Sequence, residues 1–185
     1  IIKGNPPIEI QGLAHNFTIT DSYLNTTGAS DFLIPSGAKG GNFTFINVTK
    51  QNNGAAINYT YNAGGNGTLR VGWWLDVFAN RTNGSFSNWT IWGVNISGKD
   101  VGGVNRISEL TNSSGSLRLG VLEYIRNAST TTYYNNYTLN FSKLGYNRSA
   151  VSLNFSTNRM VSVMLGYANI TECGVLNDAN TTYYL

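Results

Sequence analysis

The stretch Val71-Gly-Trp-Trp-Leu-Asp-Val77 places an apolar side chain at every second position. Successive side chains of a β-strand point to opposite faces, so this period of two predicts a strand with one buried face. The same period recurs along the whole chain and predicts about nine strands, and hence an all-β protein. These sets are Phe17/Ile19, Phe43/Phe45, Ile57/Tyr59/Tyr61, Val71/Trp73/Leu75/Val77, Trp92/Val94/Ile96, Leu117/Leu119/Val121, Tyr137/Leu139/Phe141, Val151/Leu153/Phe155 and Val161/Val163/Leu165.

Glycine and Asn-Gly steps separate these predicted strands. Turn signals at such spacings are typical of an antiparallel β-sandwich of the immunoglobulin type. Only residues 104–110 have the pattern of a short helical turn. We see no repeat of fixed period, and no change in composition marks a second large domain. The signals are Gly40-Gly41, Asn53-Gly54, the run from Gly64 to Gly67, Asn83-Gly84, Gly102-Gly103 and Gly115.

The composition predicts a globular, exported chain. Of 185 residues, 41% are hydrophobic and 12% aromatic, which is enough for a core, while only 11% are charged. The net charge of +3 comes from scattered Lys and Arg, so no nucleic-acid partner is expected. No stretch approaches the roughly 20 apolar residues of a membrane span. Because the chain starts at Ile1 and not at Met, we expect a processed form whose signal peptide has been removed.

Asparagine is the unusual feature of the composition. The chain has 26 Asn, and 18 of them lie in N-x-S/T sequons. Random placement of the Asn residues relative to the Ser and Thr of the chain would give only about five sequons, so the preference of Asn for turns does not account for their number. The candidate glycosylation sites are Asn16, Asn25, Asn42, Asn47, Asn58, Asn66, Asn80, Asn83, Asn88, Asn95, Asn112, Asn127, Asn136, Asn140, Asn147, Asn154, Asn169 and Asn180.

Many of these sequons have an apolar middle residue, as in Asn42-Phe43-Thr44, Asn88-Trp89-Thr90 and Asn140-Phe141-Ser142. In a strand such a tripeptide sends the middle side chain to the core and the Asn to solvent, where a glycan can be attached. We therefore expect a heavily N-glycosylated extracellular protein. Covalent N-linked glycans are expected in place of any cofactor.

The sequence offers little for catalysis. His15 is the only histidine, which leaves no metal site or nucleophile pair to predict. The carboxylates are dispersed, although Asp76 and Glu123 could meet in the fold. Cys173 is the only cysteine, so it is either a small buried side chain or half of an intermolecular bridge. We expect no enzyme, no catalytic residues and no metal.

Residues 1–14 differ from the rest of the chain. They carry no sequon and hold Pro6 and Pro7, after which Ile8 and Ile10 alternate with polar residues. One interpretation is a first strand of the chain's own sandwich behind a short frayed tail. The other is a donor strand that completes the sheet of a neighbouring subunit. The absence of glycan sites favours the donor strand, because a glycan would block insertion into a groove.

A sugar-binding domain is the main alternative. Aromatic faces bind sugars, and adjacent aromatic residues occur at Trp73-Trp74, Tyr133-Tyr134 and Tyr183-Tyr184. Adjacent residues of a strand point to opposite faces, so one of each pair is free to lie outside the core. Packing under glycans or at an interface explains such outward rings equally well.

A sandwich with dense sequons, no disulfide and an alternating N-terminal arm resembles the subunit of the archaeal thread, a surface filament of thermoacidophilic archaea. That family is similar in fold to bacterial type I, or chaperone-usher, pilins and joins its subunits head to tail by donor-strand complementation. The resemblance covers the whole chain but rests on composition and layout, without a sharp motif. The donor residues that it implies are Ile1, Ile2, Ile8, Ile10 and Leu13.

Together these observations predict residues 1–14 as a donor-strand arm and residues 15–185 as a glycosylated, pilin-like β-sandwich. The predicted function is a structural subunit of an extracellular, pilus-like filament that serves adhesion or cell contact. Its partners would be identical subunits in a homopolymer. The alternative is a glycosylated surface-layer or sugar-binding adhesion domain that does not polymerise through the arm.

Overall fold

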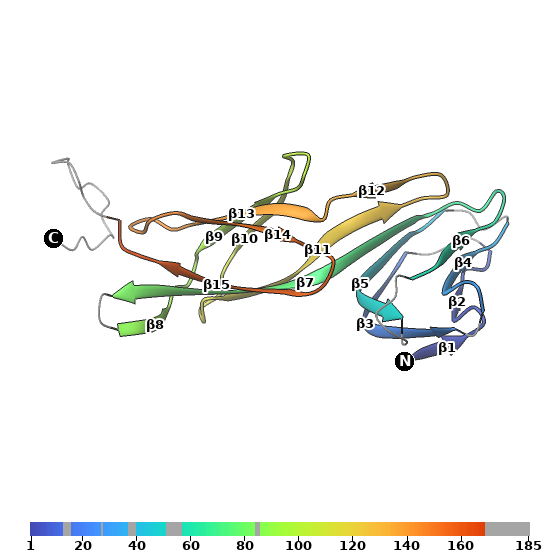
Figure 1. Cartoon of the computed structure of the whole chain (residues 1–185), viewed down its shortest axis with the longest axis horizontal. Coiled ribbons are helices and arrows are strands. Elements are labelled where there is room, and N and C mark those ends of the chain that lie inside the picture. The colour runs from blue at the N-terminus through green and yellow to red at the C-terminus, as the bar shows by residue number, and fades with distance from the viewer. Residues whose placement is uncertain (13–15, 27, 37–39, 51–56, 84–85, 169–185) are drawn as a thin grey trace. The chain divides into compact units, whose positions relative to one another are not determined.

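The computed structural model describes residues 1–12, 16–26, 28–36, 40–50, 57–83 and 86–168. Within these ranges the regular structure consists of fifteen β-strands (Figure 1). The expected all-β fold class is confirmed. Among the described residues, no helix has the length and hydropathy needed to cross a membrane.

The chain divides into two compact units. The first comprises Ile1–Trp74, Gly120–Asn135 and Phe155–Arg159, and the second comprises Leu75–Leu119, Asn136–Asn154 and Met160–Leu185. Strands β7 (Thr68–Asn83) and β11 (Ser116–Arg126) contribute residues to both. The units differ in strand pairing, so each is described by itself.

The first unit has two sheets, in which the strands from β1 to β7 pair in parallel and β11 and β12 pair antiparallel. One sheet contains β1 (Ile2–Gly4), β3 (Phe17–Thr26), β5 (Asn42–Lys50) and the start of β7, followed by the end of β11 and β12 (Thr131–Tyr133). The other contains β2 (Ile8–Glu9), β4 (Phe32–Ile34) and β6 (Tyr59–Tyr61). From β1 to β7 the chain alternates between the sheets, so each turn of this coil supplies one strand to each (Figure 1).

This parallel pairing differs from the antiparallel sandwich that the sequence predicts. All the registers from β1 to β7 are parallel. Phe17 pairs with Phe43, which pairs with Leu69, and the coil offset of 26 residues also brings Asn16 next to Asn42. The Asn-Phe-Thr tripeptide therefore recurs at the same position in successive coils. The offset is 26 residues between β3, β5 and β7, but 22 from β1 to β3, 24 from β2 to β4 and 27 from β4 to β6, so the coils share no fixed period.

Aromatic rings from both sheets form the core of the first unit. Phe32 of the second sheet is fully buried, with ring centroids 5.4 Å from those of both Phe43 and Phe45. Phe17 lies 5.0 Å from Phe43 and extends the same cluster toward the N-terminal coil. The core therefore joins the two sheets through Phe43 and Phe45, which the period-two pattern predicts to be buried, and through Phe32, which lies outside the predicted sets.

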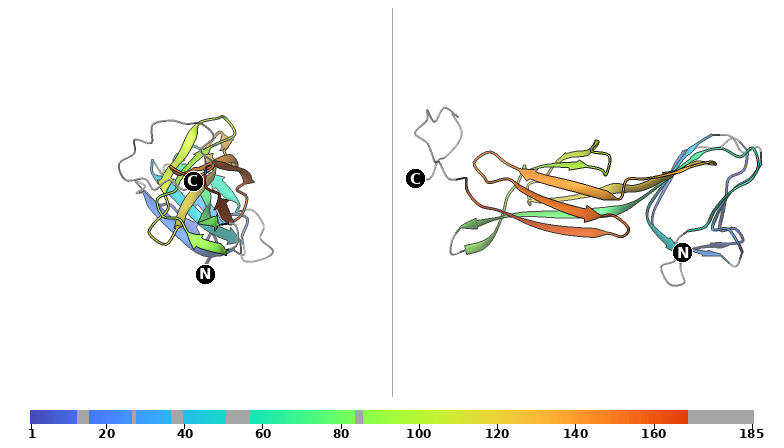
Figure 2. Two further views of the ribbon diagram at one scale, coloured as in Figure 1. Left: turned by 90° about the vertical axis from the view of Figure 1, so that its left-hand side faces the viewer. Right: turned by 45° about the horizontal axis from the view of Figure 1, so that its top comes forward.

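The second unit has the antiparallel pairing that the sequence predicts. One sheet has the order β10 (Asn105–Leu110), β9 (Asn95–Lys99), β13 (Asn136–Ser142) and β14 (Ser149–Asn154), all antiparallel. The end of β7 pairs with β8 (Phe86–Thr90) and with β15 (Arg159–Leu165), and Figure 2 shows these strands as a separate layer from the four-stranded sheet.

Alternating burial defines the core of the second unit. On β13, Tyr137, Leu139 and Phe141 are buried between exposed neighbours, and β15 repeats this pattern from Val161 to Leu165. The predicted helical turn at residues 104–110 is wrong, because residues 105–110 form β10. Only Ile107 of this strand is buried, so one side chain of β10 enters the core.

Candidate functional site

The N-terminal arm forms the first coil of the first unit. Strand β1 pairs in parallel with the end of β3, where Ile2 lies opposite Leu24. Strand β2 pairs in parallel with β4, where Ile8 lies opposite Phe32. The Ile10 amide donates a hydrogen bond of 3.0 Å to the Leu33 carbonyl, which continues this pairing by one residue. The arm thus makes its contacts with strands of its own chain.

The predicted donor residues have different environments. Ile10 is buried in the core, and Ile2 and Ile8 are half-buried and pack against it. Ile1 is 71% exposed, and Leu13 lies outside the described residues. Insertion of this arm into a neighbouring subunit stays a prediction.

A tight turn connects the two strands of the arm. A side chain at Gly4 would place its Cβ 2.7 Å from the Pro6 carbonyl oxygen and 2.9 Å from the Pro7 Cα. Both atoms belong to the backbone, so only glycine fits without moving the turn. This turn sets the spacing between Ile2 and Ile8, which enter the core from different sheets.

The sequon asparagines lie at the surface wherever their side chains are described. Asn25, Asn47 and Asn80 are half-buried. The side chains of Asn83, Asn88, Asn169 and Asn180 lie outside the described residues. The exposed sites are Asn16, Asn42, Asn58, Asn66, Asn95, Asn112, Asn127, Asn136, Asn140, Asn147 and Asn154. This placement leaves these side chains accessible, while their glycosylation stays a prediction.

The middle residues of several sequons are buried as predicted. Phe43, Phe141 and Phe155 are at most 1% exposed. Trp89 is an exception, because 60% of it is exposed. The Arg81 guanidinium lies 4.3 Å from the centroid of the Trp89 ring, so a cation–π contact holds this ring outside the core. The expectation that Trp89 enters the core is therefore wrong.

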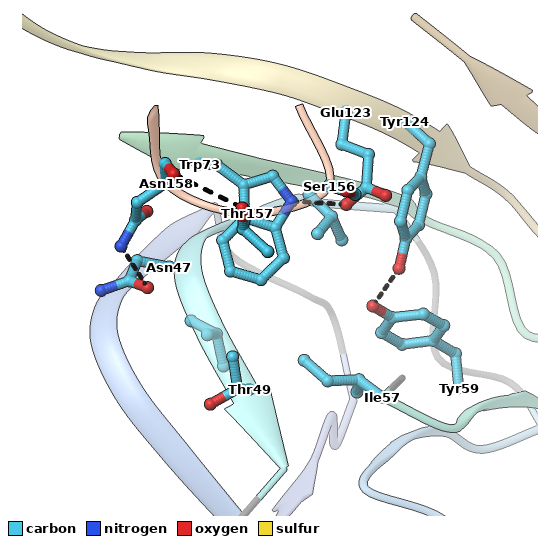
Figure 3. A pocket seen from close by; sticks show the side chains of 12 residues that line it. Asn47, Thr49, Ile57, Tyr59, Trp73, Glu123, Tyr124, Ser156, Thr157 and Asn158 are labelled. Atoms are coloured by element: carbon cyan, nitrogen blue, oxygen red, sulfur yellow. Dashed lines mark hydrogen bonds between the residues drawn. The ribbon is translucent and has the colours of Figure 1, made fainter. Parts of the chain in front are cut away.

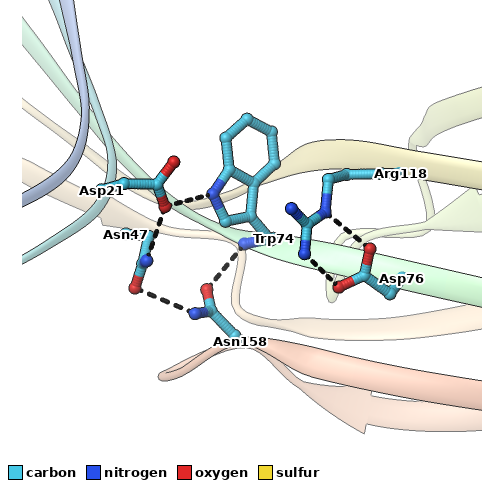
Figure 4. Close-up of polar contacts among 6 residues, drawn as sticks. All are labelled: Asp21, Asn47, Trp74, Asp76, Arg118 and Asn158. Carbon is cyan, nitrogen blue, oxygen red and sulfur yellow. Dashed lines mark hydrogen bonds and ion pairs between the residues drawn. The ribbon is translucent and has the colours of Figure 1, made fainter.

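A polar cluster joins the coils of the first unit (Figure 4). The Asn47 side-chain nitrogen, Nδ2, donates to Asp21 Oδ1 at 2.7 Å, and the Trp74 indole nitrogen donates to the same oxygen at 2.8 Å. Asn158 donates to the Asn47 side-chain oxygen at 2.9 Å. Asp21 and Asn47 occupy equivalent positions one coil apart, and both have left-handed backbone angles, with φ of 49° and 54°. Asp and Asn tolerate this conformation better than most residues.

We expect glycan occupancy at Asn47 to be lower than at Asn140. A glycan is attached to the side-chain nitrogen, and in the half-buried residue Asn47 this nitrogen donates a hydrogen bond to Asp21. Asn140 is exposed in the middle of β13. Quantitative glycopeptide mass spectrometry of the native protein would measure both occupancies. Equal, near-complete occupancy would contradict the expectation.

A cleft of about 470 Å³ opens within the first unit (Figure 3). Aromatic side chains from three strands line it: Tyr59 of β6, Trp73 of β7 and Tyr124 of β11. Polar side chains come from β5 and from the segment before β15, with Asn47 and Asn158 among them. The cleft thus combines ring faces with amide and hydroxyl groups. Trp73 stands out in the sequence as one of two adjacent tryptophans, but no pattern in the sequence groups it with the other lining residues.

Hydrogen bonds fix the side chains of the cleft. The Trp73 indole nitrogen donates to Glu123 Oε2 at 2.6 Å. Burial raises the pKa of the Glu123 carboxyl, and the bond from Trp73 offsets part of this rise. The hydroxyls of Tyr59 and Tyr124 share a hydrogen bond, and burial raises the pKa of both, that of Tyr124 to about 12. Both tyrosines therefore stay neutral at any physiological pH.

The structure gives no support for an acid–base pair between Asp76 and Glu123. The two carboxylates have different partners: Glu123 accepts from the Trp73 indole, and Asp76 pairs with Arg118. Arg118 binds both oxygens of Asp76, at 2.7 and 2.8 Å, and lowers the pKa of that carboxyl (Figure 4). Among the described residues, no group of His, Cys, Asp and Glu is arranged to hold a metal ion.

Asp100 organises the loop before β10 in the second unit. Its carboxylate accepts hydrogen bonds from the Gly102 and Val104 amides at 2.9 and 3.0 Å, and from Arg106 Nε at 2.8 Å. The bond from Arg106 lowers the pKa of this carboxyl most, and the two amides lower it further. Desolvation opposes this shift.

The lowered pKa of Asp100 predicts a pH-dependent contribution to stability. A carboxyl with a folded-state pKa below its ordinary value of 3.8 stabilises the fold above that value, and loses this effect as pH falls through the folded-state pKa. We expect Asp100→Asn to lower the melting temperature clearly at pH 7 and much less at pH 2. Circular dichroism melts at both pH values would measure this, with the exposed Glu109→Gln as control. An equal loss at both pH values would contradict the expectation.

The adjacent aromatic residues of the sequence differ in exposure. Trp73 and Trp74 are both half-buried, so neither ring is fully outside the core. Tyr133 is 57% exposed and Tyr134 is half-buried, as the strand alternation of that pair predicts. The residues that lie outside the described ranges are His15, Cys173, Tyr183 and Tyr184.

Comparison with known proteins gives matches only among solved structures. No protein-family model and no curated protein matches the chain. The minor pilin GBS52 of Streptococcus agalactiae matches with a TM-score of 0.39 and 15% identity, over 57% of this chain and 52% of that one. The E269A mutant of the shaft pilin SpaA of Lactobacillus rhamnosus GG matches with a TM-score of 0.40 and 13% identity, over 53% of this chain and 52% of that one.

The N-terminal domain of the same shaft pilin SpaA gives a TM-score of 0.36 at 12% identity, over 56% of this chain and 99% of that one. The chain spans about half the length of the first two structures. At these TM-scores the likeness does not by itself assign a fold family or a function.

Proposed function

We propose that the chain is a structural, non-enzymatic subunit of an extracellular filament whose identical subunits join head to tail through the N-terminal arm. The observation that carries this proposal is the way the arm docks. It contributes one short strand to the edge of each sheet of the first unit and places Ile8 and Ile10 against the core. Edge strands that dock by backbone pairing and apolar side chains are the elements that subunits exchange.

Exchange requires no new type of contact. The places beside β3 and β4 that accept the arm of the same chain would accept the identical arm of a neighbour. Each subunit would then give one arm and receive one. Such a head-to-tail contact joins two different surfaces, and it builds an open fibre when the rotation from one subunit to the next does not close a ring. A subunit with no arm in place would expose unpaired strand edges beside buried aromatic residues, which is an aggregation hazard.

Glycosylation fits the same proposal. The described sequon asparagines lie at the surface, and residues 1–14 contain no sequon, so attached glycans would cover the subunit and leave the exchanged arm bare. Heavy N-glycosylation, secretion to the cell surface and a role in adhesion or cell contact complete the proposal. It corresponds to the archaeal thread that the composition resembles.

Electron microscopy of the natively purified protein tests polymerisation directly. We expect long, thin fibres with an axial repeat of one subunit. Discrete particles or a flat lattice would contradict the proposal and favour a glycosylated surface-layer or sugar-binding domain. The cleft beside Trp73 is the observation that favours this second function.

A further inference from the structure

We propose that the cleft beside Trp73 binds a neutral saccharide. This inference goes beyond the proposed function and does not depend on exchange of the arm, because the described lining residues all belong to the first unit and none of them lies in residues 1–12. The volume of the cleft, about 470 Å³, lies within the range of small-molecule sites, roughly 300–1,000 Å³. Nothing in the filament proposal requires such a cleft.

The two kinds of lining side chain match the two kinds of saccharide surface. Sugar rings have apolar C–H faces that pack on aromatic rings, and Tyr59, Trp73 and Tyr124 supply such rings in the cleft (Figure 3). Sugar hydroxyls both donate and accept hydrogen bonds. The amides of Asn47 and Asn158, like the Thr157 hydroxyl, can also do both.

Other classes of ligand fit the lining less well. An anionic ligand would need Lys or Arg, but the only charged side chain among the described lining residues is Glu123. The Asn47 and Asn158 amides bond to each other, but each keeps a second N–H and a second lone pair, and an apolar ligand would cover these without offering a hydrogen bond, which is costly. A small organic cation could stack on the rings and pair with Glu123, but it would not use the amides and hydroxyls.

Glu123 positions the aromatic surface for a sugar. Its Oε2 accepts the bond of 2.6 Å from the Trp73 indole nitrogen and so fixes the orientation of that ring. We assign the second carboxylate oxygen as an acceptor for a saccharide hydroxyl. Hydrogen bonds to an ionised carboxylate are stronger than those to a neutral group, so binding should weaken when Glu123 is protonated.

Two sources could supply the saccharide in a filament. If the proposed glycosylation holds, the glycans of neighbouring filaments are one source, and binding them would join filaments side by side. Glycans of another cell surface are the other source. Glycans released from the protein itself and free commercial saccharides distinguish the two.

Isothermal titration of the full-length protein tests the inference. The probes are methyl α-glucoside, methyl α-mannoside, chitobiose, the protein's own released glycans and choline. We expect saturable binding of at least one saccharide and a loss of at least about tenfold in affinity for Glu123→Gln, which removes a charged acceptor. This variant keeps an oxygen for the Trp73 indole, and its melting temperature shows whether it folds. Trp92→Ala is the control, because Trp92 is 67% exposed in the second unit and should not affect binding.

Three outcomes would overturn the inference. They are no saturable binding of any saccharide, binding that Glu123→Gln leaves unchanged, and binding of choline alone. Displacement of a bound saccharide by a synthetic peptide of residues 1–14 would instead support the cleft as the saccharide site and show that the arm competes for it. Filament formation is scored separately by microscopy. A failure of saccharide binding would therefore not count against the proposed filament function.

Discussion

A chain lacking residues 1–12 is expected to form no filaments and to melt well below the full-length protein. The deletion removes Ile10 from the core and the half-buried Ile2 and Ile8 from its edge, together with the outer strand of each sheet. At roughly 1.5–3 kcal/mol for full burial of such a side chain and half of that for each half-buried one, the free energy of unfolding falls by about 3–6 kcal/mol. Size-exclusion chromatography with light scattering, electron microscopy and thermal unfolding would measure these effects.

A synthetic peptide of residues 1–14 should rescue the truncated chain. We expect it to bind with one peptide per subunit, to raise the melting temperature and to leave the complex monomeric, since the peptide carries no second subunit. A peptide with Ile8→Ser and Ile10→Ser is the matched control and should not bind. Filaments formed by the truncated chain alone would show that the arm does not join the subunits.

The substitution Phe32→Ala is expected to destabilise the first unit by about 3–5 kcal/mol. Phe32 is fully buried, and its ring packs edge-on against Phe43 and Phe45 from the opposite sheet. Truncation leaves a cavity at the contact between the sheets, and the neighbouring aromatic rings are too rigid to fill it. Chemical denaturation followed by tryptophan fluorescence would measure the loss, because Trp73 and Trp74 report on the same unit.

Phe78→Ala is the matched control for this substitution. Phe78 has the same side chain but is 42% exposed in the second unit, so its truncation should cost about 1 kcal/mol or less. Similar losses for the two variants would show that the aromatic cluster is not the main source of stability in the first unit.

The sequence predicts which residues are buried better than it predicts how the strands pair. Phe43 and Leu139 are both buried by the same period of two, but one lies in a parallel sheet and the other in an antiparallel sheet. That period reports only which face of a strand is covered, and pairing depends on segments far apart in the chain. The recurrence of Asn-Phe-Thr at residues 16 and 42 was the available signal for the coils.

In the candidate sites, too, local exposure is predictable from the sequence and long-range contacts are not. Exposure of sequon asparagines follows from strand alternation, as on β13, where Asn140 is exposed beside buried Phe141. Trp89 departs from this rule because Arg81 holds its ring at the surface, a contact that no local pattern encodes. The cleft could not be predicted, because β5, β6, β7, β11 and the segment before β15 all contribute to it.

The equal offsets of β3, β5 and β7 make the first unit adjustable in length. Register partners on these three strands recur after 26 residues, and Asp21 and Asn47 make the same left-handed bend at the same level. A tandem copy of residues 16–41 would therefore meet a compatible strand on each side and would extend both sheets by one member. Duplication or loss of such a segment is a simple genetic route to longer or shorter relatives of this chain. The short polar residue at the bend is the feature that each new copy would have to keep.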